Sequence, residues 1–368
     1  MIRIQYTTLA ERTGFNNGHA ISRPTSYGSF DLPTLEKTLV EIKKTKTKLV
    51  RMFFNMEWAL DGDVLGKYNE EHKVFHRELF KLLCKYDLTP MIVFISDVPN
   101  RKVYREHAAA ATNNPDLLIH ANFEKFKNRR NSGMHECFWP IINSYCSQVL
   151  KQGAEVFKEN QKLWTNYVTV EFENEGGYVV DSEFAADSSI PYGTYPSNFA
   201  AMLDDRLYGP NAVNLYGAVY MPPSYEAMQG FAREIETSLG SWTKASPWVN
   251  LHLYVPYETG DTIDTLEKKL KARLAELLLI VDATPALAKK PVALTEFGVS
   301  KLPLELRKVY LVELAKRLAK MSRVVFAVAY AMTEVTWNGT AFTKSNWAIL
   351  DFQELKYPLG FHPPADVT

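Results

Sequence analysis

The sequence lacks the charge excess and the long apolar runs that would assign it to two large classes of protein. Its 42 Lys and Arg residues balance its 42 Asp and Glu residues, so the formal net charge of the 368-residue chain is zero. Nucleic-acid binders draw much of their affinity from surplus Lys and Arg. No apolar run reaches the length needed to cross a membrane. We therefore expect neither a nucleic acid nor a membrane as a partner.

The chain also lacks a secretory signal and a paired set of cysteines. Its first residues, MIRIQYTTLAERTG, contain no apolar core of a signal peptide, so we expect a cytoplasmic protein or one whose signal has been removed. Cys84, Cys137 and Cys146 are odd in number and do not have the spacing of metal ligands. Cys84 and Cys146 lie among apolar residues on predicted helices, which indicates buried thiols.

What the chain does contain is an alternation of short β-branched segments with longer amphipathic segments, a pattern typical of parallel βαβ units. The predicted strands are residues 2–6, 48–54, 90–95, 167–172, 215–220, 248–253, 292–297 and 324–330. The predicted helices are residues 32–44, 70–86, 138–160, 199–209, 225–239, 265–281 and 305–321. Eight strands, seven helices and no Gly-x-Gly-x-x-Gly motif favour an α/β (β/α)₈ TIM barrel over an open doubly wound sheet.

We predict a single domain over residues 1–368, because the chain has no internal repeat, no low-complexity tract and no linker rich enough to divide it. The segment GFNNG at residues 14–18 fits a loop at the top of the barrel, and the chain after Tyr330 is too polar for a good closing helix. Two long connections follow the third and fourth strands. The first, residues 98–132, is basic and has only a weak helical pattern, and the second covers residues 176–197. Loops in these places lie on the face that carries barrel active sites.

Polar and aromatic residues recur where the predicted strands end. Because the carboxyl ends of barrel strands meet at one face, we expect these side chains to converge. Each position is weak evidence alone, but their joint placement at strands two, four, six, seven and eight indicates a site, to which Tyr220 of the fifth strand is added. The residues, in chain order, are Arg51, Asn174, Glu175, Tyr220, His252, Tyr254, Glu296 and Trp337.

The order of these residues resembles that of the clan A glycoside hydrolases, most closely the family 5 cellulases and mannanases. The stretch Glu171-Phe-Glu-Asn174-Glu175-Gly176 is similar to the family's strand-four motif, with Gly where the family usually has Pro. His252-Leu-Tyr254 and Thr295-Glu296-Phe297-Gly298 are similar to the motifs of strands six and seven. Arg51 and Trp337 match the arginine of strand two and the tryptophan after strand eight. The family's strand-three histidine has no counterpart, since FISDVPN offers only Ser96 and Asp97.

The resemblance implies retaining hydrolysis of a β-linked oligo- or polysaccharide without a metal or cofactor. That reaction needs two carboxyl groups about 5–5.5 Å apart, one protonated and one ionised. By the resemblance, Glu175 is the acid/base and Glu296 the nucleophile. The implied supporting roles are hydrogen bonds to Glu296 from Arg51 and Tyr254, a hydrogen bond from Asn174 to the sugar 2-OH, further support from His252 and Tyr220, and an aromatic platform made by Trp337 and extended by Trp58.

Other interpretations of the same residues stay open at this stage. Glu171, Glu173, Glu175, His252 and Glu296 could instead ligate Mg²⁺ or Mn²⁺ in a barrel lyase or isomerase. A non-catalytic barrel could bind glycans through Trp337, Trp58 and the loop tyrosines. A transglycosylase would use every residue named for hydrolysis. The sugar, the linkage, endo or exo action, the roles of Glu173 and of the basic segment, and the oligomeric state do not follow from the sequence.

Overall fold

The computed structural model describes residues 8–17, 32–95, 98–128, 132–161, 169–171, 214–215, 248–283, 288–333, 335–337, 342–344 and 349. Strands β1 to β8 form one parallel sheet in the order β5-β4-β3-β2-β1-β8-β7-β6. This is the cyclic strand order of a (β/α)₈ barrel, written from β5 to β6. The predicted fold class is therefore confirmed, while the single-domain assignment stays a prediction.

Most strands of this sheet lie where the sequence predicts them, and a short hairpin that was not predicted follows the sheet. Their bounds are β1 Thr13–Asn17, β2 Leu49–Asn55, β3 Thr89–Ile95, β4 Thr169–Glu171, β5 Asn214–Leu215, β6 Val249–Pro256, β7 Val292–Ser300, β8 Val324–Thr333, β9 Val335–Trp337 and β10 Phe342–Lys344. The pair β9 and β10 is antiparallel and follows β8 directly. Six of the eight predicted strands thus coincide with β2, β3, β4, β6, β7 and β8, while the predicted strand 215–220 shares Leu215 with β5 and otherwise lies outside the described residues.

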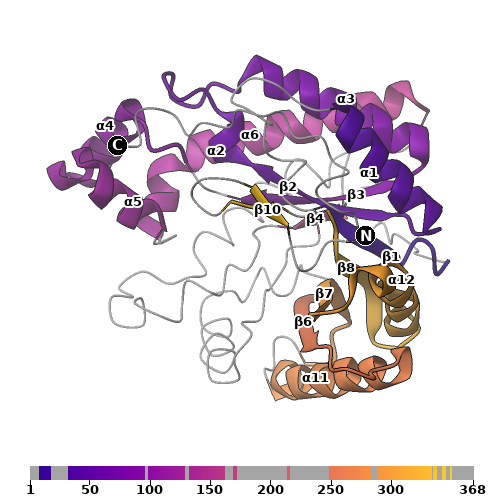
Figure 1. The fold of residues 1–368 in the computed structure, drawn as a ribbon. Coiled ribbons are helices and arrows are strands. Elements are labelled where there is room, and N and C mark those ends of the chain that lie inside the picture. The colour runs from indigo at the N-terminus through magenta and orange to yellow at the C-terminus, as the bar shows by residue number, and fades with distance from the viewer. Residues whose placement is uncertain are drawn as a thin grey trace.

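Helices cover the sheet between these strands. Their bounds are α1 Leu32–Lys44, α2 Met56–Ala59, α3 Glu70–Tyr86, α4 Lys102–Thr112, the 3₁₀ helix η1 Pro115–Leu118, α5 His120–Asn128, α6 Ser132–Glu159, α11 Ile263–Ala283 and α12 Leu304–Ala319. Helix α3 packs against both α1 and α6 on one side of the molecule, while α11 and α12 pack together beside β6, β7 and β8 (Figure 1). The helices predicted at residues 199–209 and 225–239 lie outside the described residues.

The first barrel strand was predicted in the wrong place. The position between β8 and β2 is occupied by Thr13–Asn17, not by residues 2–6. β1 includes the GFNN segment, which looks like a loop because it lacks β-branched residues. Gly14 explains the choice, since a Cβ there would lie 2.1 Å from the carbonyl oxygen of Leu49 on β2. The position of β1 is therefore set by its close approach to β2 and not by the strand propensity of its own residues.

The connection after β3 is also more ordered than its weak helical pattern predicted. It folds into α4, η1 and α5, which project at the left of the view, away from α11 and α12 (Figure 1). Asn100 ties this region together: its side-chain amide donates to Glu124 at 2.7 Å, and its oxygen accepts from Arg105 at 2.9 Å. Part of the basic charge in residues 98–132 therefore forms internal contacts.

The apolar core has two layers, which follow from the alternation of side chains along the strands. The larger layer lies between strands and helices and includes Phe15, Leu251 and Phe297. The smaller layer fills the barrel interior and draws on five strands or their ends. Its buried residues are Leu49, Met91, Trp248, Ala293, Phe326 and Val328. The second layer lies beneath the candidate site and supports it.

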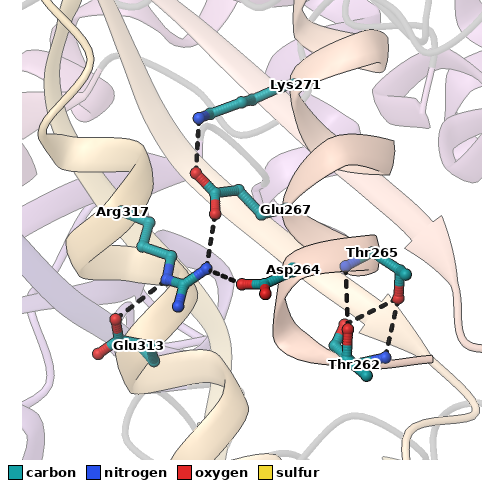
Figure 2. A network of polar contacts seen from close by, with 7 residues as sticks. All are labelled: Thr262, Asp264, Thr265, Glu267, Lys271, Glu313 and Arg317. Carbon is teal, nitrogen blue, oxygen red and sulfur yellow. Dashed lines mark hydrogen bonds and ion pairs between the residues drawn. The ribbon is translucent and has the colours of Figure 1, made fainter.

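An ion-pair network joins α11 to α12 at the surface. Figure 2 shows Arg317 of α12 between Asp264 and Glu267 of α11, at 2.5 and 2.7 Å, with Glu313 at 3.0 Å. Thr262 and Thr265 exchange hydrogen bonds at the start of α11 and cap its first turn (Figure 2). The hydrogen bonds that the Arg317 guanidinium donates to Asp264, Glu267 and Glu313 raise its pKa.

Candidate functional site

The carboxylate of Glu296 lies at the centre of the candidate site. Its Oε1 accepts a hydrogen bond from Arg51 Nη1 at 2.6 Å, and its Oε2 accepts one from the Tyr254 hydroxyl. The Nδ1 of His252 lies 3.3 Å from the same Oε2. Both carboxylate oxygens are therefore held, one by a cation and the other by two neighbours on a single strand.

These contacts bring together strands that are far apart in the sheet order. Arg51 is on β2 and Glu296 on β7, with β1 and β8 between them. In a flat sheet, three strand spacings of about 4.8 Å would separate their backbones by roughly 14 Å. A 2.6 Å contact between the two side chains requires the sheet to curve around its interior. The site is a consequence of that curvature.

Burial makes the pairing of Arg51 with Glu296 essential to the site. The Arg51 side chain is 0% exposed and that of Glu296 is 5% exposed. An ionised group withdrawn from water is tolerated only when a partner and hydrogen bonds replace its hydration. The guanidinium carbon of Arg51 also lies 4.9 Å from the centre of the Phe53 ring, which adds a cation–π contact. The carboxylate is thus presented in one fixed orientation.

The alternation along β6 explains why His252 and Tyr254 share this site. Val249, Leu251 and Leu253 point toward the helices and belong to the outer core. The residues between them occupy the other face of the strand, so His252 and Tyr254 point into the barrel. His252 pairs in register with Glu296, which places the imidazole beside the carboxylate.

Tyr330 belongs to the same region and was missed in the sequence. Phe326 and Val328 on β8 line the barrel interior, so a period of two places Tyr330 on the inner face, nearer the carboxyl end of the strand. Its ring meets that of Tyr254 edge to face, with centres 6.2 Å apart and planes at 81°. The alternation within the predicted strand 324–330 is the signal that could have found it.

Several predicted site residues cannot be placed beside Glu296. Asn174, Glu175 and Tyr220 lie outside the described residues. Trp58 falls in α2 directly after β2, and Trp337 falls in β9, which follows β8, but only their backbone positions are described. Their roles stay predictions. Glu171 ends β4, and only its backbone position is described.

The described part of the chain contains no group of three or more His, Cys, Asp or Glu side chains arranged to hold a metal ion. The Arg51 guanidinium at 2.6 Å from Glu296 would repel a cation placed on that carboxylate. No helix in the described ranges is long and apolar enough to cross a bilayer. Cys84 and Cys146 are buried, as predicted.

A second group of buried titratable side chains lies away from this site. The Tyr68 hydroxyl shares a hydrogen bond with His76 Nδ1, and the Tyr68 ring meets Tyr145 of α6 edge to face. Burial lowers the pKa of His72 to about 4 and places the pKa of His76 well below its usual range. Both imidazoles are therefore neutral inside α3 at neutral pH.

Comparison with solved structures finds similar proteins, whereas comparison with family models and with curated proteins finds none. No protein-family model matches the chain, and no curated protein matches it either. A GH5-4 broad specificity endoglucanase from Clostridium longisporum superposes with a TM-score of 0.52 at 15% identity, over 95% of this chain and 93% of that one. Another, from an uncultured bacterium, superposes with a TM-score of 0.50 at 16% identity, over 88% and 87%. ZgEngAGH5_4 in complex with a cellotriose gives 0.52 at 12% identity, over 88% of each chain.

The fold is that of family 5 glycoside hydrolases. The resemblance seen in the order of motifs is therefore confirmed at the level of the fold along most of the chain. Within the family 5 fold, the strand-two arginine, the strand-six His-x-Tyr pair and the strand-seven glutamate of this chain meet at one carboxylate. Residues separated by up to 245 positions in the sequence thus form one site.

Proposed function

We propose that the protein is a retaining glycoside hydrolase that cleaves a β-linked oligo- or polysaccharide, with Glu296 as nucleophile and Glu175 as acid/base. The observation that carries this proposal is the buried carboxylate of Glu296, held on one oxygen by Arg51 and on the other by Tyr254. The family 5 fold, shared with endoglucanases, adds support. One of those structures holds a cellotriose, which suggests a β-linked glucan or a related polymer as substrate.

The geometry around Glu296 suits nucleophilic attack on an anomeric carbon. The hydrogen bonds from Arg51 and Tyr254 hold one carboxylate oxygen each and fix the direction of the carboxylate. As the glycosidic bond breaks, Glu175 would donate its proton to the leaving oxygen while Glu296 forms a bond to the anomeric carbon. Water, activated by the same Glu175, would then release the sugar with retained configuration.

Tyr330 extends this proposal to the sugar-binding surface. Its ring stands next to Tyr254 near the carboxyl end of β8, the barrel face on which substrates bind. An aromatic face there can pack against the apolar face of a pyranose ring. We assign Tyr330 to the substrate-contacting wall, together with the platform predicted for Trp337 and Trp58.

The position of Arg51 also supports hydrolysis over the metal-dependent alternative. A divalent ion that used Glu296 as a ligand would lie within a few ångströms of a buried, permanently charged guanidinium. Hydrolysis has no such conflict, because the carboxylate itself is the reacting group. Glycan binding without catalysis would leave this held carboxylate without a role.

The test is hydrolysis of aryl β-glycosides, β-glucans and β-mannans in the presence of EDTA. We expect turnover by the wild type and by Glu305→Gln, a control at an exposed glutamate of α12, and a loss of at least about 1,000-fold for Glu296→Gln and Glu175→Gln. Proton NMR of the first product should show the β-anomer. Inverted product, activity only with added Mg²⁺, or full activity of Glu296→Gln would each contradict the proposal.

A further inference from the structure

The pairing register of β7 shifts at the same place against both of its neighbours, β6 and β8. On β6, the consecutive residues Leu251 and His252 pair with Leu294 and Glu296. On β8, Ala327 and Ala329 are two residues apart, but their partners Leu294 and Phe297 are three apart. Each neighbouring strand therefore passes over one residue of β7. The extra residue is Thr295, directly before the carboxylate at the centre of the site.

On either side of the bulge, the residues of β7 occupy the faces that they would have in a regular strand lacking residue 295. Ala293 lies in the inner layer, while Leu294 and Phe297 lie in the outer core. A regular strand without residue 295 would keep these three on the same faces and would also place Glu296 inward. The pairing with β6 and β8 on either side of the bulge would be unchanged. The ladder with β6 therefore has no need of the extra residue, whereas against β8 it offsets a second shift, in which Val292 and Leu294 of β7 pair with Val324 and Ala327 of β8.

The local effect of the bulge falls on Glu296. A bulge bends its strand and increases its twist, and bulges near active sites re-aim a neighbouring side chain. The partner of Glu296 across the bulge is His252, whose Nδ1 is 3.3 Å from the carboxylate. On the other oxygen, Arg51 makes a 2.6 Å contact from the opposite side of the barrel. The contacts with His252 and Arg51 lie on opposite sides of the carboxylate. Both therefore depend on the direction in which the backbone of β7 points the Glu296 side chain.

We propose that Thr295 is a positioning residue whose extra backbone unit aims the Glu296 carboxylate at Arg51 and Tyr254. The role belongs to the added residue in the strand and not to the threonine hydroxyl. This inference rests on the proposed function of Glu296 as nucleophile and specifies how the strand presents it.

The test compares deletion of Thr295 with the isosteric substitution Thr295→Val, using the aryl β-glycoside that the wild type hydrolyses best. Misplacement of a reacting group by about 1 Å can cost about 100-fold in rate, so the deletion should lower kcat by about that factor with KM changed less than about threefold. Thr295→Val keeps the residue count and should retain kcat within about threefold of the wild type. Both variants should unfold cooperatively in urea.

Three outcomes would overturn the inference. Wild-type kcat in the deletion variant would show that the bulge does not aim Glu296. A deletion variant that does not fold would make the bulge a requirement of the barrel. A Thr295→Val variant as slow as the deletion would assign the role to the hydroxyl. Inactivity of the wild type on all substrates would refute the proposed function instead. If the wild type is inactive, a crystal structure of the deletion variant tests the positioning role directly. Loss of the Arg51–Glu296 contact would support that role, and an unchanged contact would overturn it.

Discussion

Removal of Arg51 should expose the energetic cost of the buried carboxylate. Arg51→Met keeps much of the side-chain volume but leaves Glu296, only 5% exposed, without its cation. Breaking a buried pair by removing one partner typically costs about 3–5 kcal/mol, mainly because the other charge stays buried. We expect a loss of that order in the free energy of unfolding, measured by urea titration at pH 7.

A double-mutant cycle separates the pair from each side chain alone. In Arg51→Met with Glu296→Gln, no uncompensated charge remains, so the loss should be smaller than the sum of the single losses by about 1–3 kcal/mol. The matched control is the surface pair Arg77–Glu159, whose side chains are 35% and 51% exposed. Its cycle, Arg77→Met with Glu159→Gln, should give a much smaller coupling because water screens both charges.

Two results would refute this reasoning. One is a loss below about 1 kcal/mol for Arg51→Met, the range of an exposed pair. The other is a coupling for Arg51 and Glu296 no larger than that of the surface pair. Either result would mean that water reaches the carboxylate and that Arg51 does not hold it in place.

Three further predictions concern the reaction, the pH dependence and the surface. Tyr254→Phe removes one donor to Glu296 and should lower kcat by about 10- to 100-fold, measured on an activated aryl glycoside. Burial lowers the pKa of His72 to about 4, so the unfolded chain takes up a proton at this residue at a higher pH than the folded protein does. The free energy of unfolding should therefore fall by up to about 3 kcal/mol as the pH drops from 6.5 to 4. In His72→Leu, the free energy of unfolding measured in urea should depend less on pH over this range. Arg317→Ala should lower Tm more than the control Lys316→Ala on the same helix, because of these two residues only Arg317 pairs with Asp264 and Glu267 in this network. The difference in Tm between the two variants should shrink in 1 M NaCl, and a difference that salt leaves unchanged would contradict an ion-pair origin.

The helices could be predicted closely where local signals and tertiary packing agree. Residues 32–44 and 70–86 were predicted as helices, and α1 and α3 have these bounds. At the start of α3, the side chain of Asn69 accepts hydrogen bonds from the backbone of Glu71 and His72, and Asp87 ends the helix in a left-handed conformation. Helix caps of this kind can be recognised in a sequence from the type and position of the residues that flank the helix.

β1 could not be predicted in the same way, because its position depends on contacts with residues far away in the chain. Residues 2–6 have a stronger strand pattern than Thr13–Asn17, yet the latter lie between β2 and β8. Gly14 is needed there for close approach to Leu49, and a glycine weakens any prediction of a strand. Pairing from both sides overrides the local preference.

The candidate site divides in a similar way. Arg51, His252, Tyr254 and Glu296 could be predicted, because their order along the predicted strands resembles that of a known family. Their convergence on one carboxylate agrees with that expectation. The bulge at Thr295 could not be predicted, since it is defined only by the registers of two neighbouring strands. A bulge has no single-residue signature when the extra residue is a threonine.

The most direct test of the account is covalent trapping of the nucleophile. A 2-deoxy-2-fluoro-β-glycoside with an activated leaving group slows release of the glycosyl-enzyme, so that the ester accumulates and can be located by peptide mass spectrometry. The account predicts a single adduct on Glu296, formed much more slowly in Tyr254→Phe than in the wild type. An adduct on another carboxylate, or hydrolysis of natural substrate with no adduct and with inversion, would contradict it.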